Sequence, residues 1–177
     1  MTNFINFITV ARIFLAPIIL MFLIFGNYLI CLLLFFLAGL TDYFDGYLAR
    51  KYNAESQLGE ILDPIADKIL IVFILIGLSV DLDSFLIAFL GSLIIAREIG
   101  VSALRDYSSR NNKSHKTKVT YLAKIKTSVQ LFTIVLYLFA LAFSFNLLII
   151  IADIFLIIAT LITLYTGYEY TLNVFKK

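Results

Sequence analysis

The sequence predicts an all-α integral membrane protein, a bundle of six transmembrane helices. Hydrophobic residues make up 62% of the 177-residue chain and its mean hydropathy is +0.99, values that a water-soluble domain of this size would not be expected to reach. Long apolar runs also alternate with short polar segments. A membrane-crossing helix needs about 20 apolar residues, so six crossings would use most of the chain.

Polar turns and loops separate the predicted spans. The first span covers residues 1–25, and its polar start, up to Arg12, is expected at the membrane interface. A cleaved signal peptide is disfavoured, because the start lacks a basic segment and no small-residue cleavage site follows the apolar run. The other spans are expected at about residues 28–42, 59–80, 85–107, 121–143 and 147–170.

Two longer polar segments connect these spans, at residues 50–57 and 108–118, and the second of them is basic. No repeat, low-complexity tract or linker divides the sequence. We therefore expect residues 1–177 to form a single membrane domain.

The distribution of positive charge predicts the orientation of the bundle. If the N-terminus is cytoplasmic, the outer turns are residues 26–28, 80–84 and 144–146, and none of these contains Lys or Arg. All 14 basic residues then fall on the cytoplasmic half. This asymmetry is typical of an N-in, C-in topology. It also places the charged clusters described below at the cytoplasmic face, where we expect the active site.

Four aspartates in the second and third predicted spans indicate a metal site. Asp42 and Asp45 are three residues apart and Asp63 and Asp67 four apart, so on helices each pair shares one face. Carboxylates brought together repel one another, and hard divalent cations with oxygen ligands relieve that repulsion. We expect Mg²⁺ or Mn²⁺, as one or two ions. No His or Cys joins the cluster, which argues against zinc or copper.

The residues between these aspartates favour a phosphate-bearing ligand. Gly46 and Ala49 are small enough to let a ligand approach the backbone closely. Arg50 can bind a phosphate with two parallel hydrogen bonds. Gly59 is expected just before the second acidic helix. The stretch therefore combines metal ligands with a phosphate site.

This stretch resembles the signature of the CDP-alcohol phosphatidyltransferases, membrane enzymes that move a phosphatidyl group from a CDP-linked lipid to an alcohol. Eight fixed positions of that signature are matched across 26 residues. They are Asp42, Asp45, Gly46, Ala49, Arg50, Gly59, Asp63 and Asp67.

The resemblance implies a role for each of these positions. The four aspartates would gather two ions, and Asp67 would also be the catalytic base that takes the proton of the acceptor hydroxyl. The CDP-lipid would be bound by Asp42, Gly46, Ala49, Arg50 and Gly59.

A basic cluster follows later in the chain. Arg97 and Arg105 are eight residues apart, two helical turns, and therefore share a helix face, while Lys124 and Lys126 begin the next apolar span. A basic interfacial stripe commonly binds lipid headgroups, but an anion pocket for a phosphorylated acceptor is the sharper interpretation. The surrounding segments, and the start of the chain except for Ile5, resemble the family branch whose acceptor is sn-glycerol 3-phosphate. That branch implies that all four cations bind the acceptor phosphate.

The expected activity is transfer of phosphatidyl from CDP-diacylglycerol to glycerol 3-phosphate, with release of CMP. The resemblance implies a multi-pass protein of the cell inner (cytoplasmic) membrane that works among membrane lipids, as a homodimer and without nucleic acid. Another acceptor, such as serine, inositol phosphate or phosphatidylglycerol, remains an alternative. A cation transporter would also use intramembrane carboxylates, and a non-catalytic lipid-binding protein would explain the basic stripe.

Overall fold

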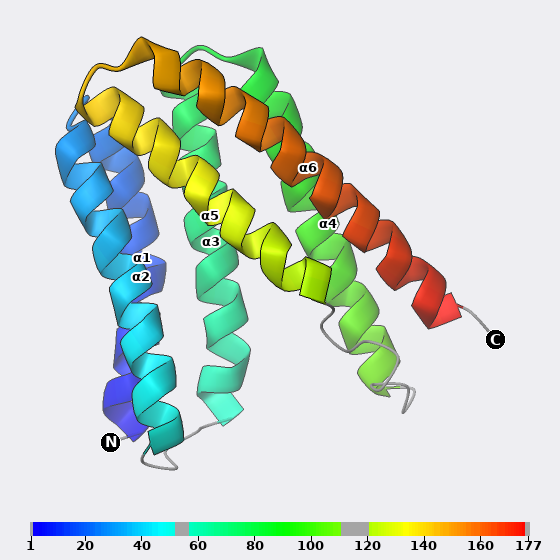
Figure 1. Cartoon of the computed structure of the whole chain (residues 1–177). Coiled ribbons are helices and arrows are strands. Elements are labelled where there is room, and N and C mark those ends of the chain that lie inside the picture. Colours follow the sequence, from blue (N-terminus) through cyan, green and yellow to red (C-terminus); the bar gives the residue numbers. More distant parts are fainter. Residues whose placement is uncertain (1, 52–56, 111–120, 176–177) are drawn as a thin grey trace. The chain divides into compact units, whose positions relative to one another are not determined.

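The described part of the chain is helical throughout, apart from three short turns. The computed structural model describes residues 2–51, 57–110 and 121–175. The predicted all-α class is confirmed (Figure 1). The helices are α1 (Thr2–Ile24), α2 (Tyr28–Lys51), α3 (Gln57–Asp81), α4 (Phe85–Arg110), α5 (Tyr121–Ala142) and α6 (Asn146–Phe175).

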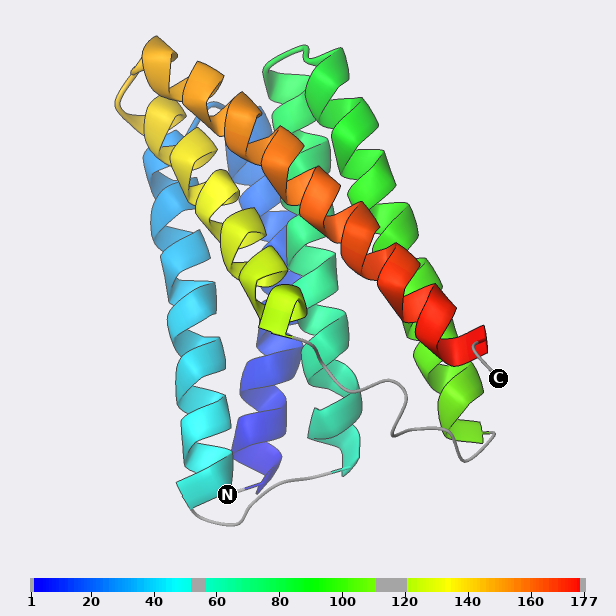
Figure 2. The same cartoon turned by 45° about the vertical axis from the view of Figure 1, so that its right-hand side comes forward.

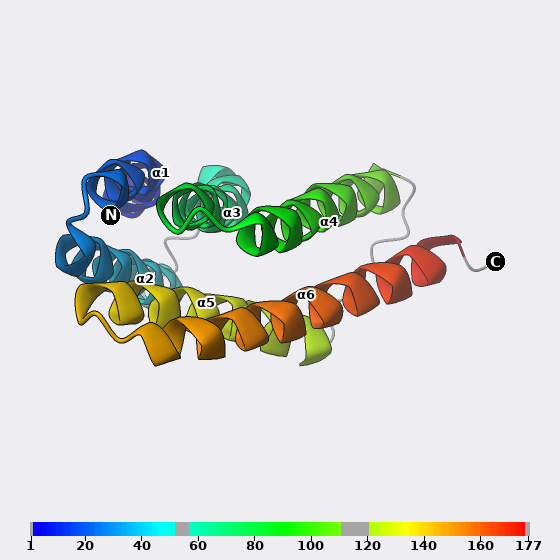
Figure 3. The ribbon, with the colours of Figure 1, turned by 90° about the horizontal axis from the view of Figure 1, so that it is seen from above.

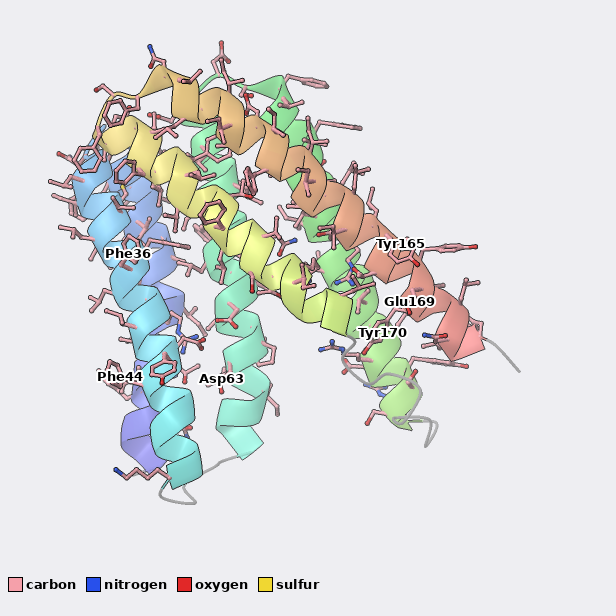
Figure 4. The ribbon with its side chains drawn as sticks, viewed as in Figure 1. Phe36, Phe44, Asp63, Tyr165, Glu169 and Tyr170 are labelled. Atoms are coloured by element: carbon pink, nitrogen blue, oxygen red, sulfur yellow. The ribbon has the colours of Figure 1, made fainter. Side chains whose placement is uncertain are left out.

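Several of these helices are suited to crossing a membrane. Among the described residues, four segments are long and apolar enough for a span: Asn6–Ile24, Phe85–Arg110, Ile125–Ala142 and Asn146–Phe175. Large apolar side chains, such as Phe36 and Phe44 on α2, are exposed, as expected where a helix faces lipid (Figure 4). The chain is therefore a multi-pass membrane protein by length and composition.

The two remaining helices are interrupted by charge. The apolar part of α2 is the shorter segment Tyr28–Phe44, and the first half of α3 carries Asp63, Asp67 and Lys68. These charged groups shorten the continuous apolar stretch available for a span. The count of six spans and the orientation of the bundle therefore stay predictions.

The three short turns share one helix-ending geometry. Gly26, Asp83 and Ser144 each adopt a positive φ, of 72°, 44° and 56°. In the first turn the amide of Asn27 donates to the carbonyl of Phe22 at 2.9 Å, which is the Schellman pattern, and the other two turns repeat it. Helices α1, α3 and α5 therefore each end at a turn that contains a residue in the left-handed conformation, and the next helix begins within three residues of it.

The first of two compact units contains α1, α2, α3 and the segment Leu138–Phe145. In this unit α1 packs against both α2 and α3 (Figure 3). Contact between α1 and α3 is close because Gly77 has no side chain, and a Cβ there would lie 2.7 Å from Cδ1 of Leu20. The central position of α1 lets its side chains contact residues of both neighbouring helices.

The second unit contains Phe85–Tyr137 and Asn146–Lys177. Here α4 and α6 run side by side (Figure 2). Buried threonines of α6 link it to its neighbours, because the hydroxyl of Thr163 accepts from Gln130 at 2.8 Å and that of Thr166 accepts from Arg97 at 2.8 Å. Each hydroxyl also donates to a carbonyl of its own helix. Each of these two buried hydroxyls therefore has both a donor and an acceptor within the unit.

Candidate active site

Two of the predicted metal ligands meet at an arginine of α1. Nη1 of Arg12 donates to Oδ1 of Asp67 on α3 at 2.8 Å and also contacts Oδ1 of Asp42 on α2. The Arg12 side chain is 1% exposed, whereas those of Asp42 and Asp67 are 48% and 50% exposed. A buried guanidinium therefore joins two carboxylates that are each about half exposed.

The third described aspartate is held one helical turn earlier on α1. The hydroxyl of Thr9, which is fully buried, donates to Oδ1 of Asp63 at 2.9 Å. Asp63 projects from α3 (Figure 4). Thr9 and Arg12 are three residues apart and so lie on one face of α1. This face positions Asp42, Asp63 and Asp67, which come from two other helices.

Two carboxylates meet at Arg12, which contacts an oxygen of each. Within the described ranges no three acidic, His or Cys side chains form a ready metal-binding group, and the side chain of Asp45 lies outside the described residues. The two carboxylates that meet at Arg12 offer oxygen donors, as Mg²⁺ and Mn²⁺ prefer. Their exposure leaves a path for an ion, but Arg12 contacts the same oxygens.

The other signature positions are only partly described. Gly46 is half-buried in α2, and Gly59 is buried. Because α3 begins at Gln57, Gly59 lies in the first turn of that helix and not before it as expected. The side chains of Ala49 and Arg50 lie outside the described residues.

In the second unit, two of the predicted acceptor-binding cations share a carboxylate. Nη1 of Arg97 donates to Oε1 of Glu98 at 3.0 Å, and Nζ of Lys126 donates to the same oxygen at 2.5 Å. Both basic side chains are 7% exposed. Glu98 therefore keeps two buried cations of α4 and α5 together, a role that was not predicted from the sequence.

The third cation, Arg105, is exposed and rests on α6. Its Nε donates to the hydroxyl of Tyr170 at 3.2 Å, and its guanidinium lies 5.5 Å from the centre of that ring. A contact of this kind with an aromatic ring limits the orientations of the guanidinium, while its other N–H groups can still donate to a ligand. The structure thus brings Arg97 and Lys126 together and leaves Arg105 accessible, while the side chain of Lys124 lies outside the described residues.

Arg12 and Thr9 were not predicted as site residues, although the sequence contains one signal for Arg12. Arg12 lies within Asn6–Ile24, a segment that is long and apolar enough to cross a membrane. An ionisable residue inside such a segment usually has a functional partner. No comparable signal marked Thr9, or Thr166 and Tyr170 on α6, because isolated hydroxyl-bearing residues are common in membrane helices.

Comparison with known proteins places this arrangement in a family. The model of the CDP-alcohol phosphatidyltransferase family matches residues 2–168. A Rickettsia typhi protein is 40% identical over 96% of both chains, and one from Rickettsia felis is 41% identical over 95% of this chain and 93% of its own. A Haemophilus influenzae protein is 36% identical over 93% of this chain and 89% of its own. All three are named CDP-diacylglycerol–glycerol-3-phosphate 3-phosphatidyltransferase.

The chain belongs to the CDP-alcohol phosphatidyltransferase family. The match includes the whole segment Asp42–Asp67 and the helices that carry both charged clusters. The acidic site around α1 therefore lies in a transferase, and the two alternatives, a cation transporter and a non-catalytic lipid-binding protein, are set aside.

Proposed function

We propose that the chain transfers the phosphatidyl group of CDP-diacylglycerol to sn-glycerol 3-phosphate, giving phosphatidylglycerol phosphate and CMP. The observation that carries this proposal is the likeness, at about 40% identity and over nearly all of both chains, to relatives named for that reaction. Another acceptor is less well supported, because the chain resembles these relatives along its whole length and carries a cationic cluster on α4 and α5.

The acidic site would bind the pyrophosphate end of the donor. Asp42, Asp45, Asp63 and Asp67 would hold one or two divalent ions, which would neutralise the charge on the pyrophosphate and on departing CMP. Asp67 is half-exposed and would take the proton of the acceptor hydroxyl. That oxygen forms a bond to the β-phosphorus of the donor as the bond from this phosphorus to CMP breaks. The CDP-lipid would also contact Gly46, Ala49, Arg50 and Gly59.

The basic cluster would bind the acceptor. Arg97, Arg105 and Lys126 carry three positive charges and Glu98 one negative charge, so this group has an excess of positive charge. A phosphate monoester carries about −1.5 to −2 at pH 7 and would be attracted to this excess. Serine has no net charge to match it. Lys124 would add a further cation.

The predicted topology and assembly are part of the same proposal. We propose a six-span protein of the inner membrane, and the distribution of Lys and Arg supports its N-in, C-in orientation. The acidic site would then be reached from the cytoplasm, where the water-soluble acceptor and CMP are found. We further propose that the chain forms one domain and works as a homodimer among membrane lipids.

The test is an assay of CMP release by the purified chain. CDP-diacylglycerol in mixed micelles would be supplied with Mg²⁺ or Mn²⁺ and with glycerol 3-phosphate, serine, inositol phosphate or phosphatidylglycerol as acceptor. We expect release with glycerol 3-phosphate only. A chelator should abolish the release, and added Mg²⁺ or Mn²⁺ should restore it.

The outcomes separate the parts of the proposal. Release with a different acceptor would keep the family and contradict the role of the basic cluster. Release that persists in the chelator would contradict the metal site alone. No release with any acceptor would contradict the transferase activity.

A further inference from the structure

A cation of the protein lies inside the acidic site. Arg12 is almost completely buried, and one of its nitrogens, Nη1, contacts Oδ1 of both Asp42 and Asp67. A buried guanidinium is costly unless acidic groups compensate its charge. Asp42 and Asp67 provide that compensation, and they are also the carboxylates proposed above as metal ligands.

These carboxylates are approached from two sides. Arg12 reaches them from the buried side, because it comes from α1 at the centre of its unit. The side chains of Asp42 and Asp67 are themselves about half exposed. The packed helices therefore do not enclose these carboxylates, which leaves them open to a second cation.

The guanidinium and a divalent cation exclude each other at these oxygens. Both are positive, and like charges that share a partly desolvated site repel strongly. Hydrogen bonds from Nη1 also reduce the negative charge that would attract an ion. The contact to Asp67 further occupies an oxygen of the proposed catalytic base.

We propose that Arg12 is a tethered counter-ion that competes with the divalent cation for Asp42 and Asp67. Its guanidinium neutralises the two carboxylates and holds α2 and α3 to α1. A divalent cation binds by taking these oxygens from the guanidinium. The inference rests on the proposed function, because the acidic site is its metal site.

The test measures Mn²⁺ binding to the full chain in detergent micelles without either substrate, from the EPR signal of free Mn²⁺. Arg12→Gln is expected to bind Mn²⁺ at least about tenfold more tightly than the wild type, because the competing charge is gone. Arg12→Lys keeps the charge but not the planar fork of donors, so its affinity should fall between the two.

The control removes the same charge elsewhere. Arg110→Gln changes an exposed residue in the last turn of α4 and should leave the Mn²⁺ affinity within about twofold of the wild type. Unchanged or weaker binding by Arg12→Gln would overturn the proposal, and Arg12 would then be a fixed structural residue.

A folding defect in Arg12→Gln would also give a clear result. If the variant is unstable, purification with Mn²⁺ present throughout should restore folded protein, because the ion replaces the lost positive charge. Failure of this rescue would count against the proposal. A wild-type chain that binds no Mn²⁺ would overturn both this inference and the metal site, whereas CMP release decides the transferase activity separately.

Discussion

Arg97 of α4 lies directly against the backbone of Gly167 of α6. A Cβ at Gly167 would come within 2.8 Å of Cγ and 3.1 Å of Nε of Arg97. Cγ is close to the main chain and cannot easily move away. The absence of a side chain at Gly167 therefore lets Arg97 reach both Thr166 and Glu98.

Gly167→Ala should impair binding of the acceptor. The added methyl group would displace Arg97 from Thr166, and we expect the KM for glycerol 3-phosphate to rise about tenfold while the KM for CDP-diacylglycerol changes little. Steady-state kinetics of CMP release would measure both constants. The matched control is Gly100→Ala on α4, where a Cβ would meet nothing within 4 Å. Equal rises in both constants would contradict an acceptor-specific role for Arg97.

Asp67→Asn should abolish turnover but leave donor binding measurable. Asn keeps the shape of the side chain and can still accept from Arg12, but an amide cannot take the acceptor's proton. CMP release would measure turnover, and binding of labelled CDP-diacylglycerol would measure the affinity for the donor. As a control, Asp153→Asn changes an aspartate that accepts from Tyr137 at 2.5 Å, and it should remain active. Turnover by Asp67→Asn would remove Asp67 from the base role.

Thr9→Val should destabilise the first unit. The substitution preserves the shape of a fully buried side chain but removes the donor to Asp63. We expect the free energy of unfolding to fall by about 1 to 2 kcal/mol, because a partly buried carboxylate loses a hydrogen bond. Thermal unfolding in detergent would measure the change. Thr160→Val, which removes a bond only to the carbonyl of Leu156, should cost less.

Ser144→Gly should stabilise the protein. Ser144 has a φ of 56°, a conformation that a Cβ disfavours and that glycine adopts readily. We expect a gain of roughly 1 kcal/mol in the free energy of unfolding. Gly26→Ala should have the opposite effect at the equivalent turn, where φ is 72° and a Cβ would meet nothing within 4 Å. A loss of stability in Ser144→Gly would show that other contacts of Ser144 dominate.

Most of the helical architecture was predictable from the sequence. Apolar runs bounded by short polar turns located the helices to within a few residues, as at Tyr28, Phe85 and Tyr121. Charges within an otherwise apolar helix made the number of spans harder to predict. Asp63, Asp67 and Lys68 lie in the first half of α3, so hydropathy alone does not decide whether that helix crosses the membrane.

The candidate site was predictable as a set of residues but not as a set of contacts. Spacing indicated that Asp42 and Asp67 would face a common centre, and the structure joins them through Arg12. No sequence pattern pairs Arg12 with these residues, because Arg12 is 30 positions from Asp42 and 55 positions from Asp67. Glu98 illustrates the same limit, because its bond to Lys126 depends on how α4 packs against α5.

The threonines of α6 restrict which side chains can face that helix. A backbone carbonyl inside a helix is normally engaged within it, but Thr163 and Thr166 donate to such carbonyls and present their own oxygens outward. Only a donor can pair with these oxygens, and Gln130 and Arg97 fill that requirement. An apolar partner would leave the hydroxyl oxygens unmatched. The positions of the two threonines along α6 thus favour one alignment of α6 with the helices that carry Gln130 and Arg97. This preference comes from hydrogen bonds and does not depend on how well the apolar surfaces fit.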